Sequence, residues 1–416
     1  MTAARQARRH ASSLRSATRD LPAAAAPPSL LGSSRSRALL VFGAILLALV
    51  FLFGGDTWLT ILNYTLVAAV GTLALNVLSG YTGQISLGIT FFMGIGAYTT
   101  AWLGGDLPSS PGDPAGLALP FFIWLPASGI VAALAGALVG PIALRLKGFY
   151  LGIVSLALVF IGLFIFTNVA VITGGVQGRT FPVPSIGSFS FDNPDPIFGI
   201  QLTSNQVYFL LLAFILGLAG LFVGNVMRSR AGRAFQAVRD NEVGASIMGV
   251  NLLRAKVGAF TFSSFLAGIA GSLWAAYPPF NALKPAEWSL LLAIQFVAAI
   301  IIGGIASVWG SILGAAFVFG LPSALDQLSI VQQSAGSGGI APGDLNALIY
   351  GALIIVFLLF EPAGIIGLIR RAQAFGRRLD DRRKHKEGGE PASALLPDPA
   401  APGAEDGVSL ATELDP

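Results

Sequence analysis

The chain offers few residues for covalent, metal or nucleotide chemistry. It has no cysteine, and its two histidines are His10 and His385, so thiol chemistry and a histidine-based metal site inside the hydrophobic part are excluded. None of the five lysines follows a glycine, so the Gly-x-x-x-x-Gly-Lys-Ser/Thr loop that cradles ATP phosphates is absent. No set of nucleophile, base and orienting group is recognisable. We expect no catalytic residue, metal or cofactor in this chain.

One polar segment, residues 228–256, interrupts the hydrophobic sequence and could receive force from another protein. It is basic and rich in helix formers. Asn241 can cap a short helix that begins at Glu242, where the helix dipole favours an acidic residue. Gly249 supplies a left-handed stop, and Asn251 can cap the next helix. The pattern predicts a helix of about two turns between two longer ones.

Two interpretations of this short helix remain open on physical grounds. Val243 and Ile247 are four residues apart and share one face, so the helix could lie in the membrane interface while its neighbouring arginines bind lipid phosphates. The same apolar face could instead press into a cleft of a cytoplasmic ATPase. The two interpretations have about equal weight until a resemblance is considered.

The sequence on either side of residues 228–256, which must position this segment, is apolar. Of 416 residues, 54% are hydrophobic and 11% are charged, against about 25% charged in soluble domains. Apolar runs long enough to cross a bilayer recur along the chain. We therefore predict an all-α polytopic membrane protein with about ten transmembrane helices, at residues 38–53, 58–78, 85–103, 119–144, 149–171, 206–227, 257–277, 288–304, 308–325 and 345–369.

Charge placement predicts the orientation. In the ten-span arrangement, 23 of the 25 lysines and arginines fall on one side, and Arg179 and Lys284 fall on the other. Because short cytoplasmic loops retain positive charge, both termini are predicted to be cytoplasmic. A cleaved signal at residues 38–53 is the weaker alternative, since Phe53-Gly54-Gly55-Asp56 offers no small-x-small cleavage site.

The chain is predicted to have three parts. Residues 1–37 and 371–416 are rich in charged and small residues, and we expect both tails to be disordered. Residues 38–370 form the predicted transmembrane domain, with 228–256 as its cytoplasmic loop. The long external loop 174–204 carries four prolines and an alternating Ser-Phe-Ser-Phe sequence at 188–191, which favours a short strand or hairpin and a docking face for an external protein.

Glycines mark two regions of the predicted spans, residues 80–96 and 303–314. Close helix packing through small residues explains most of them. Where glycines flank polar residues, as in 79–88, a broken or unwound helix that lines a path is expected. The two regions lie in opposite halves of the chain, which fits an internal duplication.

Ionisable side chains are absent from the middle of every predicted span. Such groups cost about 2.5–3.5 kcal/mol each at a helix centre, and where they occur they mark proton relays. Their absence argues against a proton-coupled pump. The polar groups left for a pathway are neutral, among them Asn63, Asn76, Gln84, Ser86, Tyr98 and Ser155.

Three segments carry a resemblance to a known family: residues 76–98 (NVLSGYTGQISLGITFFMGIGAY), 232–249 (GRAFQAVRDNEVGASIMG) and 303–315 (GGIASVWGSILGA). They resemble the branched-chain amino acid ABC transporter permeases, in particular the M-type subunit, and the similarity extends over about 39–369. Importer permeases generally carry Glu-Ala-Ala followed by glycine in this loop. This chain instead has Glu242-Val-Gly-Ala245, with Gly249 seven residues after the glutamate.

The resemblance implies one permease subunit of an ATP-driven importer in the cytoplasmic membrane. Its expected partners are a second, H-type permease, two cytoplasmic ATP-binding subunits, an external substrate-binding protein and membrane lipid; nucleic acid is not expected. Residues assigned to coupling with the ATPase are Arg239, Glu242, Ala245 and Gly249. Residues assigned to the translocation pathway are Gly83, Gln84, Ser86, Gly88, Phe92 and Tyr98.

The sequence leaves open alternatives for both the substrate and the energy source. A neutral pathway suits a zwitterionic amino acid, and the same architecture could carry urea, short amides or another small polar solute. A different class of function is a channel or facilitator that works without ATP.

Overall fold

The computed structural model describes residues 55–107, 116–145, 149–186, 189–192, 194, 202–277 and 282–327, and then 351, 352, 354, 355, 359, 364–368 and 371. The chain divides into two compact units, Met1–Ile366 and Gly367–Pro416. All elements below belong to the first unit. The predicted span 38–53, most of the span 345–369 and the two predicted tails, apart from Arg371, lie outside the described residues.

The protein is mostly helical, as predicted. Seven helical stretches of the described residues are long and apolar enough to cross a membrane: Asp56–Tyr81, Phe121–Ile142, Tyr150–Asn168, Ser204–Arg228, Leu252–Ala276, Pro285–Gly303 and Val308–Leu325. Each overlaps one predicted span. These stretches make the chain a multi-pass membrane protein, while the count of ten and the orientation of the termini stay predictions.

The helix boundaries follow from local sequence signals. Helix α8 (Ser204–Arg228) begins with a capping box in which Thr203 and Gln206 bond each other's backbone. Helix α11 (Leu252–Ala276) begins directly after Asn251, which caps it as predicted, and so starts five residues before the predicted span 257–277. Apart from the helices whose bounds are given below, the described residues also form α5 (Phe121–Arg145), α6 (Phe149–Asn168), α7 (Ala170–Thr173), η2 (Gly175–Gln177), η4 (Pro285–Glu287), α12 (Leu290–Gly303), α13 (Val308–Ala315), η5 (Ala316–Gly320) and α14 (Leu321–Asp326).

The predicted break in the glycine-rich region 79–88 is confirmed. Helix α3 (Asp56–Leu75) continues as a π-helix, η1 (Asn76–Tyr81), and residues 82–88 are not helical before α4 (Ile89–Gly104) begins. Gly83 has a φ of 69°, which a helix does not contain and a glycine adopts freely. The predicted start of the third span at Ile85 is therefore wrong, and we call residues 82–88 the connecting loop.

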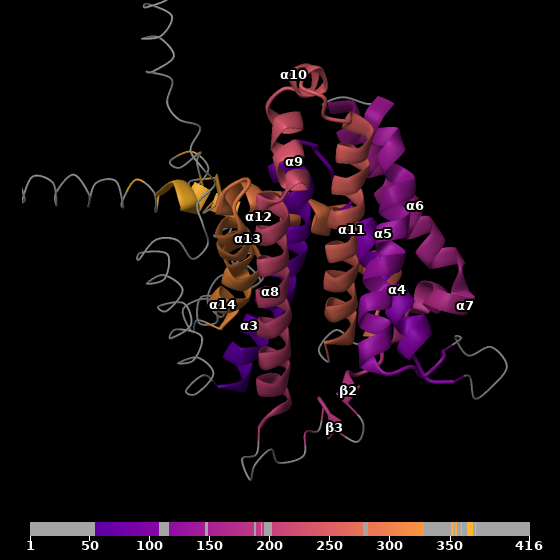
Figure 1. Ribbon diagram of the computed structural model, residues 1–416. Helices are drawn as coiled ribbons and strands as arrows, with labels where there is room; N and C mark the ends of the chain where they lie inside the picture. Colours follow the sequence, from indigo (N-terminus) through magenta and orange to yellow (C-terminus); the bar gives the residue numbers. More distant parts are fainter. Residues whose placement is uncertain are drawn as a thin grey trace, which may run out of the picture. The chain divides into compact units, whose positions relative to one another are not determined.

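Helix α11 packs against α5, α4 and α3 (Figure 1). The approach to α4 is close enough to require glycine, because a Cβ on Gly96 would overlap the Gly268 carbonyl and one on Gly271 would overlap the Met93 carbonyl. A Cβ on Gly268 would also meet Ala132 of α5. Small residues thus let three backbones meet, as expected for helices in a membrane.

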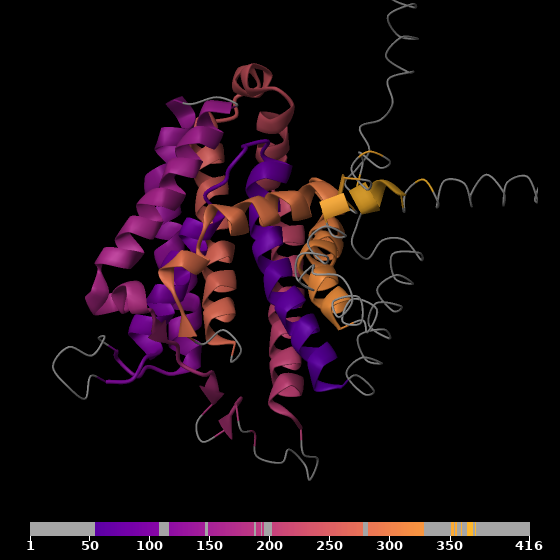
Figure 2. The same cartoon turned by 180° about the vertical axis from the view of Figure 1, so that it is seen from behind.

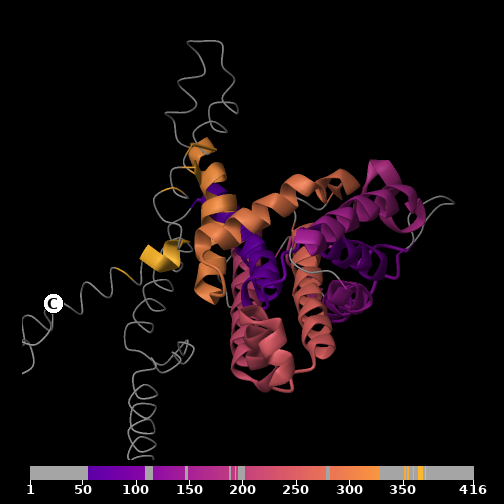
Figure 3. The ribbon, with the colours of Figure 1, turned by 90° about the horizontal axis from the view of Figure 1, so that it is seen from above.

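The second glycine-rich region joins α12 to α13. A Cβ on Gly303 would overlap the Gly310 carbonyl, and one on Gly314 would overlap the Ala299 carbonyl. The turn between the helices uses Gly304, with a φ of 119°, and Ala306, with a φ of 58°. Helix α12 runs across the bundle rather than alongside α8 and α11 (Figures 2 and 3).

Among the described residues, four strands of two residues each modify the expectation of an all-α protein. Strand β2 (Ser185–Ile186) pairs antiparallel with β3 (Phe189–Ser190), so the expected strand in loop 174–204 is confirmed. Strand β1 (Arg179–Thr180) pairs antiparallel with β4 (Ala282–Leu283). Figure 1 places β2 and β3 at the end of the bundle opposite to the short helix α10 (Glu242–Ile247).

Candidate functional site

Two short helices follow α8 at the end of the bundle marked by α10. Helix α9 (Arg230–Asp240) is capped by Ser229, whose Oγ accepts from the Ala231 N–H at 3.2 Å. It buries Gly232, Phe235 and Val238, which recur at three-residue intervals and therefore share a face. The segment 228–256 is basic and rich in helix formers, but no separate helix at 230–240 was predicted from the sequence, although this periodicity was present.

The capping predictions for α10 are confirmed. The Oδ1 of Asn241 accepts from the Gly244 N–H at 3.0 Å, Gly249 has a φ of 84°, and the Oδ1 of Asn251 accepts from the Arg254 N–H at 3.0 Å. These signals act within three or four residues of the chain, so the sequence alone contains them. They fix a tight turn that carries α10 between α9 and α11.

Helix α10 and the residue that follows it expose large apolar side chains to solvent. Val243 is 63% exposed, Ile247 78% and Met248 84%, whereas Ala245 on the opposite side is buried. Exposed clusters of large apolar side chains mark contacts with lipid or with another protein. We call Val243, Ile247 and Met248 the apolar tip of α10.

The carboxylate of Glu242 is held from inside the protein. Lys256 Nζ donates to Glu242 Oε1 at 2.7 Å, with the Lys256 side chain 3% exposed and that of Glu242 32% exposed. Sequence reasoning assigned Glu242 to a partner and missed this bond, because the two residues stand on different helices. Opposite charges on either side of a capped turn were the available signal.

The connecting loop reaches the same end of the bundle. A Cβ on Gly83 would lie 3.1 Å from Arg239 Cγ, so the loop backbone rests on α9. The Leu87 N–H donates to Ser155 Oγ of α6 at 2.8 Å, and Gln84 Nε2 donates to Thr82 Oγ1 at 3.1 Å. The loop is thus fixed between α6 and α9.

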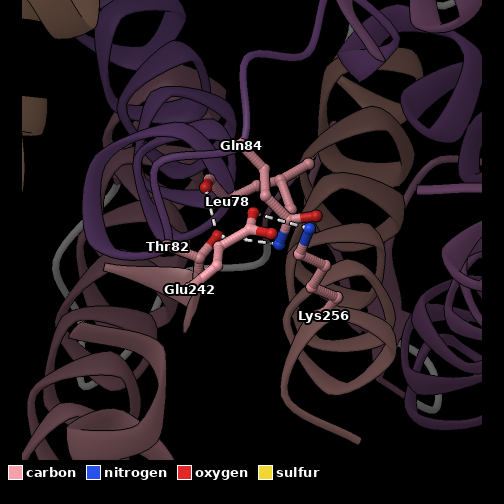
Figure 4. Close-up of polar contacts among 5 residues, drawn as sticks. All are labelled: Leu78, Thr82, Gln84, Glu242 and Lys256. Carbon is pink, nitrogen blue, oxygen red and sulfur yellow. Dashed lines mark hydrogen bonds and ion pairs between the residues drawn. The ribbon is translucent and has the colours of Figure 1, made fainter. Parts of the chain in front are cut away.

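A polar cluster forms where the connecting loop faces α10 and α11. Figure 4 shows the amide of Gln84, the carboxylate of Glu242 and the ammonium of Lys256 pointing toward one another. Gln84 is buried, and its Oε1 has no hydrogen-bond partner among the described residues. The structure therefore brings a predicted pathway residue next to a predicted coupling residue.

The predicted pathway residues lie mostly inside the chain. Ser86 accepts from the Gly88 N–H at 3.2 Å, and the ring of Tyr98 packs on Phe166 with centroids 4.9 Å apart. Those buried are Gln84, Ser86, Gly88, Phe92 and Tyr98, while Gly83 is exposed. Their place in a translocation pathway, like the coupling role of Arg239, Glu242, Ala245 and Gly249, stays a prediction.

A second polar network lies at the N-terminal end of α3 and α8. Asn205 Nδ2 donates to Asp56 Oδ1 at 2.8 Å, and Tyr277 OH donates to Asn205 Oδ1 at 2.8 Å. Asn63 Nδ2 donates to the Asn205 carbonyl at 2.9 Å. This network ties α3, α8 and the end of α11 together. Of its members, Asn63 alone was counted from the sequence among the polar groups available to a pathway.

Arg179, one of the two cations on the predicted external side, is half-buried beside α7. Its Nη1 donates to the Ile172 carbonyl at 2.8 Å. Burial lowers the pKa of the guanidinium from its usual value, and the charge of Asp106 opposes that shift. An arginine stays protonated under such conditions, so it remains a fixed positive charge at this end.

Comparison with known proteins places these features in one family. Residues 36–358 match the family model described as branched-chain amino acid transport system / permease component. The high-affinity branched-chain amino acid transport system permease protein LivM of Escherichia coli (strain K12) is 30% identical over 358 residues, which cover 82% of this chain and 78% of the relative.

Other relatives extend the comparison. LivM of Salmonella typhimurium is 29% identical over 357 residues, which cover 82% of this chain and 78% of the relative. The probable branched-chain amino acid transport permease protein LivH of Methanocaldococcus jannaschii is 28% identical over 181 residues, which cover 43% of this chain and 53% of the relative. No solved structure is significantly similar. The family match covers more than half of the chain, including η1, the connecting loop, α9 and α10, and the chain therefore belongs to the permease component family of branched-chain amino acid transport systems.

Proposed function

We propose that the chain is a permease subunit of an ATP-driven importer that carries branched-chain amino acids across the cytoplasmic membrane. The observation that carries this proposal is the pair α9–α10, a capped helical projection whose apolar tip the chain leaves uncovered. The sequence has no loop for ATP phosphates. The energy therefore enters through a partner, and α10 is the surface built for contact with it.

The partners follow from the family. Relatives of both kinds, named LivM and LivH, are permease proteins of the same transport systems, so we propose an H-type permease as the second subunit. Two cytoplasmic ATP-binding subunits and an external substrate-binding protein complete the proposed importer. The strands β2 and β3 lie at the end opposite to α10, which is where an external binding protein would dock.

The substrate proposal rests on the relatives' printed names and on the buried polar groups near the connecting loop. Gln84, Ser86 and Tyr98 are neutral, and a zwitterion needs no fixed counter-charge to pass neutral groups. All the proposed pathway residues except Gly83 are buried within the chain. Transport then requires α4 or the connecting loop to shift relative to its neighbours.

Reconstitution tests this function. The chain is placed in liposomes with its second permease, ATP-binding subunits and binding protein, and uptake of radiolabelled leucine, isoleucine and valine is measured with and without ATP. We expect uptake only with ATP and with all subunits. Uptake that persists without ATP would mean a facilitator, and ATP-dependent uptake of urea in place of leucine would overturn the substrate.

A further inference from the structure

An ion pair at the base of α10 joins the buried Lys256 to the partly exposed Glu242. Lys256 is 3% exposed, and its ammonium is bound to Glu242 on the first turn of α10. A buried charge is stable only when it keeps a partner. The position of α10 is therefore coupled to the charge of Lys256, which belongs to the spanning helix α11.

The second acceptor near Lys256 belongs to the connecting loop. Gln84 Oε1 is buried without a hydrogen-bond partner among the described residues, and Figure 4 shows its amide directed toward Lys256 and Glu242. An ammonium has three N–H donors. Because Gln84 Oε1 lies beside the Lys256 ammonium and has no bond within the described part of the chain, the ammonium can exchange its bond to Glu242 for a bond to Gln84 Oε1.

The connecting loop can transmit the effect of such an exchange to helix α4. Gln84 stands between Gly83, which rests on Arg239 of α9, and Leu87, which is bonded to Ser155 of α6. Ser86 and Gly88 follow directly before α4 begins. A change in the bond made by Gln84 therefore acts at the break between η1 and α4.

We propose that Lys256 is a positioning residue that holds α10 through Glu242 in this state and bonds Gln84 Oε1 when a partner displaces α10. The exchange keeps the ammonium paired in both states and links the docking helix to the connecting loop. This inference rests on the proposed function for the source of the displacement. The structural part, that Lys256 holds α10, does not depend on ATP.

The functional test is a double-mutant cycle of Lys256→Met and Gln84→Leu in the complete reconstituted complex. We expect each variant to lower the amount of substrate moved per ATP hydrolysed by about tenfold. The double variant should fall no further than the Lys256→Met variant, because both changes break the same link. Independent, additive losses, or an unchanged ratio in Gln84→Leu, would overturn the exchange.

Stability separates this role from a merely structural one. Gln84→Leu removes an acceptor that has no partner among the described residues and one hydrogen bond, from Gln84 Nε2 to Thr82 Oγ1, so its thermal unfolding temperature should fall only slightly, by the small contribution that one hydrogen bond makes. Gln84→Met is the second variant if the leucine side chain packs badly. Arg254→Gln is the matched control, since Arg254 is an exposed cation two residues before Lys256, and it should retain the normal transport ratio.

A spin label on α10 tests the positioning part without ATP. The chain has no cysteine, so Met248→Cys gives one labelling site on the exposed tip. In lipid nanodiscs, Lys256→Met should increase the mobility of the label, and Arg254→Gln should not. Unchanged mobility overturns the proposal, whereas increased mobility combined with no ATP-dependent uptake by the unaltered, unlabelled protein would remove the proposed function and keep Lys256 as the residue that holds α10.

Discussion

Asn76 joins segments of the chain that are 231 residues apart. Its Nδ2 donates to the Ser307 carbonyl at 2.9 Å and to Ser311 Oγ at 2.7 Å, and its Oδ1 accepts from the Ala306 N–H at 2.9 Å. The side chain is fully buried and stands at the first residue of η1. One amide thus fixes both the start of the π-helix and the turn between α12 and α13.

Replacement of Asn76 by leucine should therefore destabilise the protein. Three hydrogen bonds are lost at about 0.6 kcal/mol each, and the partly buried Ala306 N–H loses its bond to Asn76, which costs a further ~1 kcal/mol. Thermal unfolding in detergent should show a clear loss of stability. Asn225→Leu is the control, since Asn225 is exposed on α8; an equal effect of the two changes would contradict this account of Asn76.

At the scale of elements, replacing a helix glycine with alanine should raise or lower stability according to whether another helix packs against that glycine. Gly96→Ala places a methyl group on the Gly268 carbonyl where α4 meets α11, and overpacking of this kind costs about 1–3 kcal/mol. Gly217 of α8 has nothing within 4 Å of an added Cβ, so alanine there gains helix propensity. Unfolding temperatures should fall for Gly96→Ala and stay level or rise for Gly217→Ala. The same sign for both would refute packing through Gly96.

The turn after α10 gives a prediction on coupling. Gly249 has a φ of 84° and open space around it, so only backbone conformation limits this position. Valine there strains the backbone by about 1–2 kcal/mol and should reorient α10, which lowers transport driven by ATP. Asparagine tolerates the left-handed conformation and should retain transport. If Gly249→Val transports normally in proteoliposomes, the shape of this turn has no role in coupling.

Sequence patterns predicted the elements better than their contacts. The caps by Asn241 and Asn251 and the stop at Gly249 are local, so the pattern contained them. The Lys256–Glu242 pair joins two helices, and the bonds of Asn76 cross most of the chain. Such pairings depend on how the helices pack, which no local pattern specifies. The break at residues 82–88 was predictable because glycines and polar residues cluster there.

At the scale of the whole molecule, the two ends of the bundle differ in what they present. One end carries the apolar tip of α10, and the opposite end carries β2 and β3 (Figure 1). The positive-inside rule predicts that α9 and α10, with their neighbouring arginines, are cytoplasmic. The network of Asp56, Asn205 and Tyr277 would then close the bundle on the external side, where water is available to the exposed Asp56.

Single cysteines test this orientation directly, since the chain has none of its own. Met248 is 84% exposed on the tip of α10, and Asp192 is exposed two residues after β3. A membrane-impermeant maleimide added to intact cells should label Asp192→Cys and leave Met248→Cys unlabelled until the membrane is opened. Labelling in the reverse order would invert the protein and place α10 outside the cell, where no ATPase could reach it. Labelling of both cysteines in intact cells would mean that the two ends lie on the same side, and the seven candidate spans would then need a different path through the membrane.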